Sequence, residues 1–247
     1  MNGRTIPMLI AACLAGLVAG FLLANAVNRN EIATLRAETE QLRKGGATVA
    51  SGQSNTSTTL SDEEINTTIQ RADQNPTDFQ TQRSHGIALY KYGAMKQDVR
   101  LLGQSVRILD RAMSLKPDDY DVTITLGNAH FDIGYFSKDN EALKKAREIY
   151  AKGLAVKPGD VDVQTDVGLT YFLETPPNLG MAEREFKKSL DTNPKHEKTL
   201  QLMIQTLAKQ SKASEANEYL ETLRNLNPSS PAIAELSDMI ANPKTSE

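Results

Sequence analysis

Apolar residues recur every three or four positions over most of the chain from residue 61 onward, which is the period of an amphipathic α-helix. The first apolar stripe consists of Ile65, Ile69 and Ala72. Ser61 followed by Glu64 forms a capping-box start before this stripe, and Pro76 stops the helix behind it. The pattern predicts a helix within residues 61–76, and comparable stripes follow it as far as residue 240.

Five prolines divide this helical region into units of similar length. They lie at positions 76, 117, 158, 194 and 228. The turn around the second proline, SLKPDD at 114–119, returns 41 residues later as AVKPGD at 155–160. Fixed offsets of this kind indicate an internal repeat, and repeats of this length indicate a solenoid.

Each unit reads as two helices, which we name helix A and helix B. Ten residues after each of the first three prolines, helix A carries a glycine, and the fourth unit has Ile204 there; the glycines are Gly86, Gly127 and Gly168. Twelve residues before each of the last four prolines, helix B carries a small residue: Ser105, Ala146, Ala182 and Ala216. A large apolar residue follows four positions later: Leu109, Tyr150, Phe186 and Leu220. Small residues let two helices approach closely, and the large one fills the gap a turn away.

These motifs resemble the tetratricopeptide repeat (TPR) family, whose signature is L-G-x2-Y, then A-x3-F, then P. The clearest copy is VGLTYF at 167–172 with AEREF at 182–186 and Pro194. The family's first tryptophan is absent, and its positions are occupied by Gln82, Thr123, Gln164 and Leu200. The resemblance implies an all-α fold, a right-handed superhelical solenoid of helix-turn-helix pairs. An uncharged apolar run near the N-terminus, considered below, places this solenoid behind a predicted N-terminal transmembrane helix.

The repeat region divides into a leading half-repeat helix at 61–76, four units and a closing segment. The units are 77–117, 118–158, 159–194 and 195–228, which together make residues 77–228. Residues 229–247 hold a capping helix and a tail, with Ser230 as the predicted N-cap and Pro231 at the first helical position.

The first two units are longer than a TPR unit, which has about 34 residues. They have 41 residues each, and the extra seven lie between the glycine of helix A and the small residue of helix B. Asp98 and Asp139 are candidate N-caps. We therefore predict that helix B starts near these two residues and is about 10 Å longer. The alternative is a long loop, because Gly93 and Gly134 favour a break in helix A.

The N-terminal segment has a different composition. Residues 5–27 contain no charged side chain and are long enough to cross a lipid bilayer as a helix. We predict an uncleaved signal anchor at 1–27. Two alternatives remain open: a signal peptide cut after Ala26, and a lipoprotein with a lipobox ending at Cys13.

The charges that flank this segment disagree about its orientation. Arg4 favours export of the repeats, whereas four basic residues beyond the span oppose it: Arg29, Arg36, Arg43 and Lys44. We predict a single-pass protein of the bacterial inner membrane with its repeats in the periplasm. Residues 28–44 read as a helical stalk or a weak coiled coil for self-association, and residues 45–60 as a flexible Gly/Ser/Thr linker.

Composition and motifs give little support to an enzyme. The net charge of −3 provides no strong field for nucleic acid. No zinc-protease, P-loop or nucleophile-elbow motif occurs, and we predict no catalytic residue, metal site or cofactor. His85 and His130 fall at positions that pack inward in the TPR family. The remote alternative, a metal-dependent enzyme that uses these two histidines, predicts bound metal.

The resemblance to TPR proteins implies that helix A lines a concave groove where partner peptides or helices dock. The twelfth position of helix A holds an aromatic residue in three units: Tyr90, Phe131 and Phe172. Neighbouring groove positions hold Arg83, Ile87, Lys91, Asn128, Asp132, Asp166 and Leu169. We predict that this aromatic ladder accepts an apolar or amphipathic segment. The alternative is that the rings only pack adjacent repeats together.

The sequence thus predicts a membrane-anchored scaffold that binds other proteins. An anchor, a linker and four repeats resemble the TPR accessory proteins of cytochrome c maturation, which present apocytochrome to the haem-attachment machinery. The alternative within the same class is a secreted or lipid-anchored TPR factor for pilus or envelope assembly.

Overall fold

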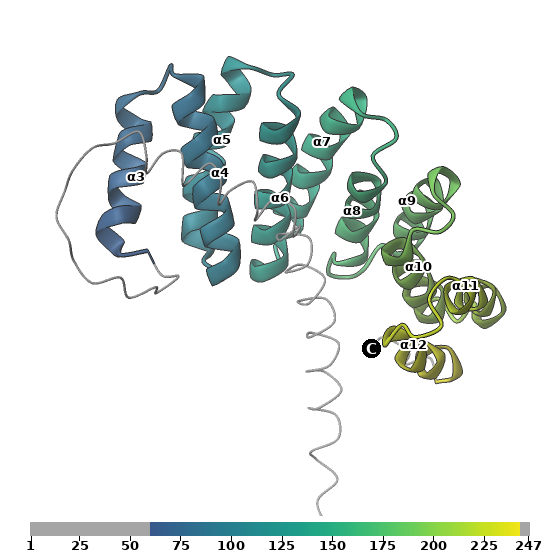
Figure 1. Ribbon diagram of the computed structural model, residues 1–247. Helices are drawn as coiled ribbons and strands as arrows, with labels where there is room; N and C mark the ends of the chain where they lie inside the picture. The colour runs from purple at the N-terminus through teal and green to yellow at the C-terminus, as the bar shows by residue number, and fades with distance from the viewer. Residues whose placement is uncertain (1–59, 243–247) are drawn as a thin grey trace, which may run out of the picture. The chain divides into compact units, whose positions relative to one another are not determined.

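A computed structural model describes residues 60–242, which contain ten α-helices and no strand (Figure 1). The leading helix is α3 (Asp62–Gln74) and the closing helix is α12 (Ala232–Ala241). Between them lie four helix pairs: α4 (Phe79–Lys96) with α5 (Val99–Leu115), α6 (Tyr120–Ser137) with α7 (Asn140–Val156), α8 (Val161–Phe172) with α9 (Leu179–Thr192), and α10 (Glu197–Lys209) with α11 (Ala213–Leu226). The predicted anchor, the stalk and all but the last residue of the linker lie outside the described residues.

Helices α4 to α12 belong to one compact unit, in which each helix packs against the next one in sequence. At two of the boundaries between pairs, helix A of one pair also meets helix A of the next: α4 contacts α6, and α8 contacts α10. The closing helix α12 packs against both α10 and α11. The described part of the chain is therefore an all-α solenoid of helix pairs, as predicted.

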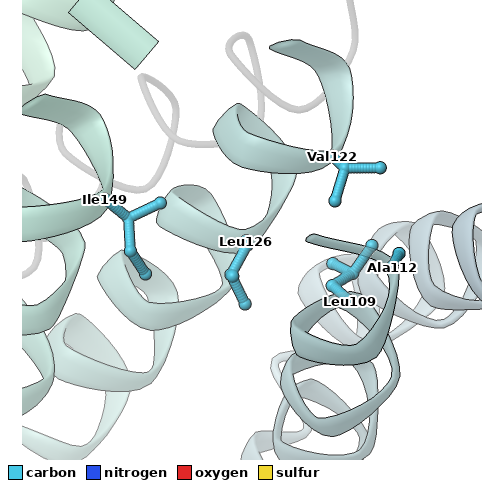
Figure 2. Close-up of a cluster of buried hydrophobic side chains, with 5 residues drawn as sticks. All are labelled: Leu109, Ala112, Val122, Leu126 and Ile149. Carbon is cyan, nitrogen blue, oxygen red and sulfur yellow. The ribbon is translucent and has the colours of Figure 1, made fainter. Parts of the chain in front are cut away.

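The core lies between successive pairs. One cluster joins Leu109 and Ala112 of α5 to Val122 and Leu126 of α6 and to Ile149 of α7 (Figure 2). All five side chains are buried. Because this cluster draws on three helices from two pairs, no single pair could form it alone.

The predicted close approach of helices A and B is confirmed. A Cβ atom added to Gly127 would lie 2.6 Å from the ring of Tyr150, and one added to Gly168 would lie 2.5 Å from the ring of Phe186. Real side chains do not pack at such distances, so the large residue of helix B occupies the space that glycine leaves.

The two turns at Pro117 and Pro158 share the sequence Lys-Pro-x-Asp, and its lysine and aspartate have the same roles in both. Asp119 and Asp160 accept hydrogen bonds from the backbone N–H groups of Val122 and Val163, at 2.9 and 3.1 Å, and so cap α6 and α8. The lysine before each proline stacks on an aromatic ring: Lys116 Nζ lies 4.3 Å from the ring centre of Phe79, and Lys157 Nζ lies 3.7 Å from that of Tyr120. The repeated tetrapeptide therefore ends one helix and starts the next.

The predicted start of helix B in the long units is confirmed. α5 begins at Val99 with Asp98 as its N-cap, and α7 begins at Asn140 with Asp139 as its N-cap. The predicted extension of about 10 Å in helix B alone is wrong. α5 and α7 have 17 residues against 14 in α9 and α11, which is a gain of about 5 Å.

Helix A takes the larger share of the extension. α4 and α6 have 18 residues, against 12 in α8 and 13 in α10. Gly93 and Gly134 do not break these helices, contrary to the alternative. A Cβ at Gly134 would lie 2.9 Å from the backbone nitrogen of Leu143, and one at Gly93 would lie 3.1 Å from that of Leu102. The glycines let the two extended helices pack closely, and both must lengthen together because each covers the other.

The first and last helices of the repeat region, α3 and α12, differ in whether their predicted N-caps form. The predicted capping box of α3 is confirmed, since Ser61 N donates to Glu64 Oε2 at 2.7 Å and Glu64 N donates to Ser61 Oγ at 3.2 Å. The predicted cap of α12 is wrong. Pro231 is its N-cap residue, and the Ser230 hydroxyl instead donates to Glu197 Oε1 at 3.0 Å.

Candidate functional site

The three rings of the predicted aromatic ladder lie on α4, α6 and α8, and all are buried. Tyr90, Phe131 and Phe172 are 7, 4 and 8% exposed. Tyr90 packs in a cluster with Leu102 of its own pair and Ala129 of the next. Tyr90 therefore packs adjacent repeats together, and less than a tenth of each of the three side chains is exposed to a partner. That they bind a partner stays a prediction.

Three of the polar groove candidates keep partial exposure: Arg83, Lys91 and Asn128. Arg83 of α4 forms ion pairs with Asp121 at 2.7 Å and with Asp119 at 3.7 Å, and a third of its side chain stays exposed. Lys91 of α4 is half-buried. The apolar candidates serve the core, since Ile87 packs against the cluster around Leu109 and Leu169 is buried.

Four of the predicted groove residues come together in one place, where two residues that were not predicted join them. We call this set the inter-repeat polar cluster: Tyr90, Asn128, Asp132, Tyr150, Asp166 and Lys198. The Tyr150 hydroxyl donates to Asn128 Oδ1 at 2.8 Å. Lys198 Nζ lies 2.7 Å from Asp166 Oδ1. The Tyr90 hydroxyl hydrogen-bonds to Asp132 and to Asn128. The cluster thus links helices of all four units.

Burial sets the electrostatics of this cluster. Asp132 and Asp166 are each 6% exposed. Burial, together with the charge of Asp166, raises the pKa of Asp132 to about 7, and the hydrogen bond from Tyr90 works against this rise. Burial also raises the pKa values of Tyr90 and Tyr150 well above their usual range. Both phenols therefore stay neutral and act as hydrogen-bond donors.

The sequence pattern did not identify Tyr150 and Lys198 as members of this cluster. Tyr150 fills the large apolar position of helix B, and nothing in the repeat pattern indicates that its hydroxyl reaches helix A. Lys198 lies near the start of α10, where the repeat lacks both the glycine and the capping aspartate. A lysine one turn from an inward-facing apolar run was the available signal.

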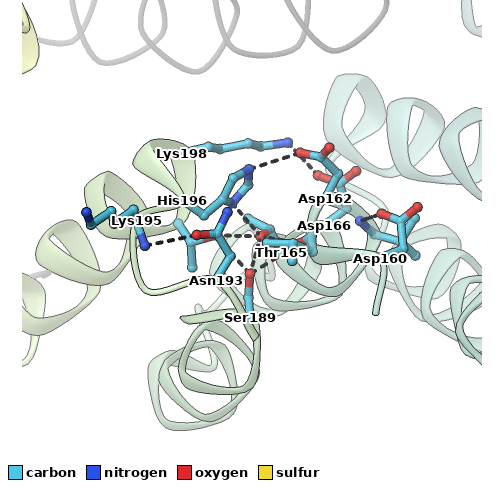
Figure 3. Close-up of polar contacts among 12 residues, drawn as sticks. Asp160, Asp162, Thr165, Asp166, Ser189, Asn193, Lys195, His196 and Lys198 are labelled. Atoms are coloured by element: carbon cyan, nitrogen blue, oxygen red, sulfur yellow. Dashed lines mark hydrogen bonds and ion pairs between the residues drawn. The ribbon is translucent and has the colours of Figure 1, made fainter. Parts of the chain in front are cut away.

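A second polar set joins the third and fourth units, and we call it the hydroxyl cluster: Asp162, Thr165, Ser189, His196 and Thr199. Figure 3 labels the first four of these residues. His196 Nε2 lies 3.2 Å from Asp162 Oδ1, and His196 Nδ1 lies 2.6 Å from Thr199 Oγ1. Thr165 Oγ1 lies 2.8 Å from Ser189 Oγ and 2.6 Å from Thr199 Oγ1. The hydrogen bond to His196 lowers the pKa of Asp162.

Carboxylate, imidazole and hydroxyl occur in the order of a catalytic triad in this cluster, but burial prevents nucleophilic chemistry. The hydroxyl-bearing residues Thr165, Ser189 and Thr199 are 0% exposed, and their hydroxyls bond to one another. A nucleophile must reach its substrate. The cluster therefore works as a polar contact between α8, α9 and α10.

The metal-enzyme alternative uses His85 and His130, and each of these two histidines has its own surroundings in the structure. His85 Nδ1 lies 3.0 Å from the carbonyl oxygen of Thr81 in its own helix. His130 is half-buried on α6, and burial lowers its pKa. Within residues 60–242, no group of three or more His, Cys, Asp or Glu side chains is placed to hold a metal ion. No helix in the same range has the length and apolar character that a bilayer span requires.

Solved structures with the same arrangement are TPR proteins. No protein-family model matches the sequence, and no curated protein is detectably similar to it. A thermophilic TPR protein of Thermus thermophilus, TTC0263, is 14% identical with a TM-score of 0.52, over 73% of this chain and 91% of that one. The MamA protein is 17% identical with a TM-score of 0.51, over 68% of this chain and 82% of that one. The described residues therefore have the fold of the tetratricopeptide-repeat proteins.

Proposed function

We propose that this protein is a protein-interaction scaffold whose helices α4, α6 and α8 present the binding surface for a partner segment. The observation that carries the proposal is the solenoid itself: stacked helix pairs create an extended surface that one partner segment can follow. Along this surface, Arg83, Lys91 and Asn128 retain partial exposure and supply polar contacts, while the small exposed part of each ring supplies apolar ones.

The burial of the rings decides how the groove should be tested. Replacing Tyr90, Phe131 and Phe172 by alanine would remove core packing and unfold the repeats. A photo-crosslinking residue at Lys91 tests the same surface without this damage. Lys144 of α7 is the matched control, because its side chain is 58% exposed on a helix B. We expect an adduct of defined mass from position 91 and none from 144. Equal crosslinking from both positions would contradict the proposal.

We further propose that residues 5–27 anchor the scaffold in the bacterial inner membrane, with the repeats in the periplasm and residues 28–44 as a weakly self-associating stalk. The uncharged run of 23 residues supports the anchor. Intact-mass analysis of the purified chain distinguishes the alternatives, since a mature protein starting at Val27 would show signal cleavage. Protection of the repeats from protease in intact cells, and its loss in spheroplasts, tests the orientation.

Apocytochrome c is the first partner that we propose to test, because the order of anchor, linker and repeats resembles the TPR accessory proteins of cytochrome c maturation. The direct assay adds an apocytochrome c peptide to the chain that carries the crosslinker at position 91. A scaffold for pilus or envelope assembly would leave this peptide unlabelled while still crosslinking a partner in cells.

A further inference from the structure

The inter-repeat polar cluster contains two buried carboxylates and one cation. Asp166 has Lys198 Nζ at 2.7 Å. Asp132 is equally buried, and among the residues that the structure describes it forms no ion pair. Its hydrogen-bond donor is the neutral hydroxyl of Tyr90. An ionised carboxylate in such a place lacks both water and a counter-charge, so its neutral form is favoured.

The polar groups near Asp132 and its neighbour Asp166 come from α4, α7, α8 and α10. Tyr90 of α4 donates to it, and the charge of Asp166 on α8 repels its own negative charge. The charges of both carboxylates help to raise the pKa of Tyr150 on α7. Lys198 of α10 forms an ion pair with Asp166. α5 also packs on α6, and within the described range it contributes no group that acts on this charge.

We propose that Asp132 is a proton-binding site that links the packing of the first three repeats to pH near neutrality. With the proton bound, the carboxyl group is neutral and its repulsion of Asp166 disappears. With the proton released, two carboxylates face one lysine across the repeat boundary, and the packing of α6 against its neighbours α4, α5 and α7 weakens. The inference concerns the solenoid itself, so it does not depend on the identity of a partner.

The direction of the pH effect follows from proton linkage. The pKa of Asp132 rises from 3.8 to about 7 on folding, so the folded chain binds the proton more tightly than the unfolded chain does. This stabilisation is fully present below about pH 4 and is lost as the pH rises from about 4 to 7. Above about pH 7, Asp132 is ionised in both the folded and the unfolded chain, so its contribution to the free energy of unfolding no longer changes with pH.

Carbon-13 NMR of the side-chain carboxyl groups of the full chain tests the site directly. The resonance that disappears in Asp132→Asn belongs to Asp132. We expect its pKa, read as the titration midpoint, to be about 7. A midpoint below about 5, the range of ordinary aspartates, would overturn the proposal. This measurement uses the wild-type fold, so it remains decisive if the variant is less stable.

Neighbouring substitutions test the geometry. Tyr90→Phe removes the hydrogen bond that favours the ionised form, so the midpoint should rise. Asp166→Asn removes the repelling charge, so the midpoint should fall. Shifts of opposite sign support the cluster as described, and an unchanged midpoint in both variants would contradict it.

Urea unfolding at several pH values tests the link to packing. The wild type should lose stability between about pH 4 and 7 relative to Asp132→Asn, whose side chain cannot ionise. Asp118→Asn is the control, because it makes the same charge change at an exposed turn position. If Asp118→Asn also removed the pH dependence, net charge rather than Asp132 would be the cause, and the proposal would fail.

Discussion

At the scale of single residues, the repeat depends on glycines that stand inside helices. Glycine in a helix interior costs about 0.5–1 kcal/mol relative to alanine. At Gly127 the cost is offset by packing, because the ring of Tyr150 occupies the space of the missing Cβ. The same ring carries the hydroxyl that bonds to Asn128. One glycine thus fixes the distance between two helices and the position of a polar group between them.

Replacing this glycine should destabilise the fold. Gly127→Ala places a Cβ 2.6 Å from the Tyr150 ring, and overpacking of this kind costs about 1–3 kcal/mol. Gly103→Ala is the matched control, because nothing lies within 4 Å of its Cβ on α5. That change should stabilise the chain by about 0.5–1 kcal/mol. Urea denaturation of both variants measures the difference, and equal midpoints would refute the packing argument.

At the scale of elements, the inter-unit turns decide where each helix A begins. Asp78, Asp119 and Asp160 occupy equivalent positions, and each side chain accepts a backbone hydrogen bond at the start of its helix. In the fourth unit His196 takes this position, makes no such bond to α10, and joins the hydroxyl cluster instead. In the fourth unit, the side chain at the capping position therefore contacts the third unit and does not cap its own helix.

Loss of one cap should have a local and predictable effect. Asp119→Ala removes the hydrogen bond to Val122 N, and helix caps contribute about 1 kcal/mol. The adjacent Asp118→Ala is the control, because Asp118 is exposed and does not cap α6. We expect the first variant to lower the free energy of unfolding by about 1 kcal/mol and the second to change it little. Comparable losses in both would mean that charge, not capping, matters here.

Local signals explain which elements could be predicted. The starts of α5 and α7 followed from Asp98 and Asp139, because a capping residue acts on its own helix. The extension of α4 and α6 did not follow, since Gly93 and Gly134 weaken a helix locally and only the backbone of the partner helix shows why they are there. Tertiary packing overrode local propensity at these two positions.

The candidate site was predictable in position and not in exposure. The spacing of Tyr90, Phe131 and Phe172 placed all three on helix A, as the structure has them. Their burial depends on how closely successive helices A approach, which a sequence period does not contain. The closeness of Asp132 to Asp166 depends on the same distance between helices. The sequence therefore predicts which residues share helix A, but it does not predict which of them are buried together.

At the scale of the whole repeat region, the solenoid combines two long helix pairs with two shorter ones. Each pair contacts its neighbours, and a structure of this kind has stability that is roughly a sum over units and interfaces. Removing a terminal element should therefore loosen the adjacent unit and leave distant units intact. The end of the chain offers the clearest test, because Leu236 and Ile240 of α12 are buried at 2 and 7% exposure.

A chain that ends at Ser229 lacks α12 and exposes the faces of α10 and α11 that it covers. We expect hydrogen exchange followed by mass spectrometry to show faster exchange in α10 and α11, with α4 to α7 unchanged. A chain that ends at Asn242 is the control and should behave as the full chain, since it retains all of α12. Faster exchange across every helix would show instead that the repeats unfold as one cooperative block. In that case the polar contacts between units, including the hydroxyl cluster of α8, α9 and α10, would couple the pairs more strongly than nearest-neighbour packing requires.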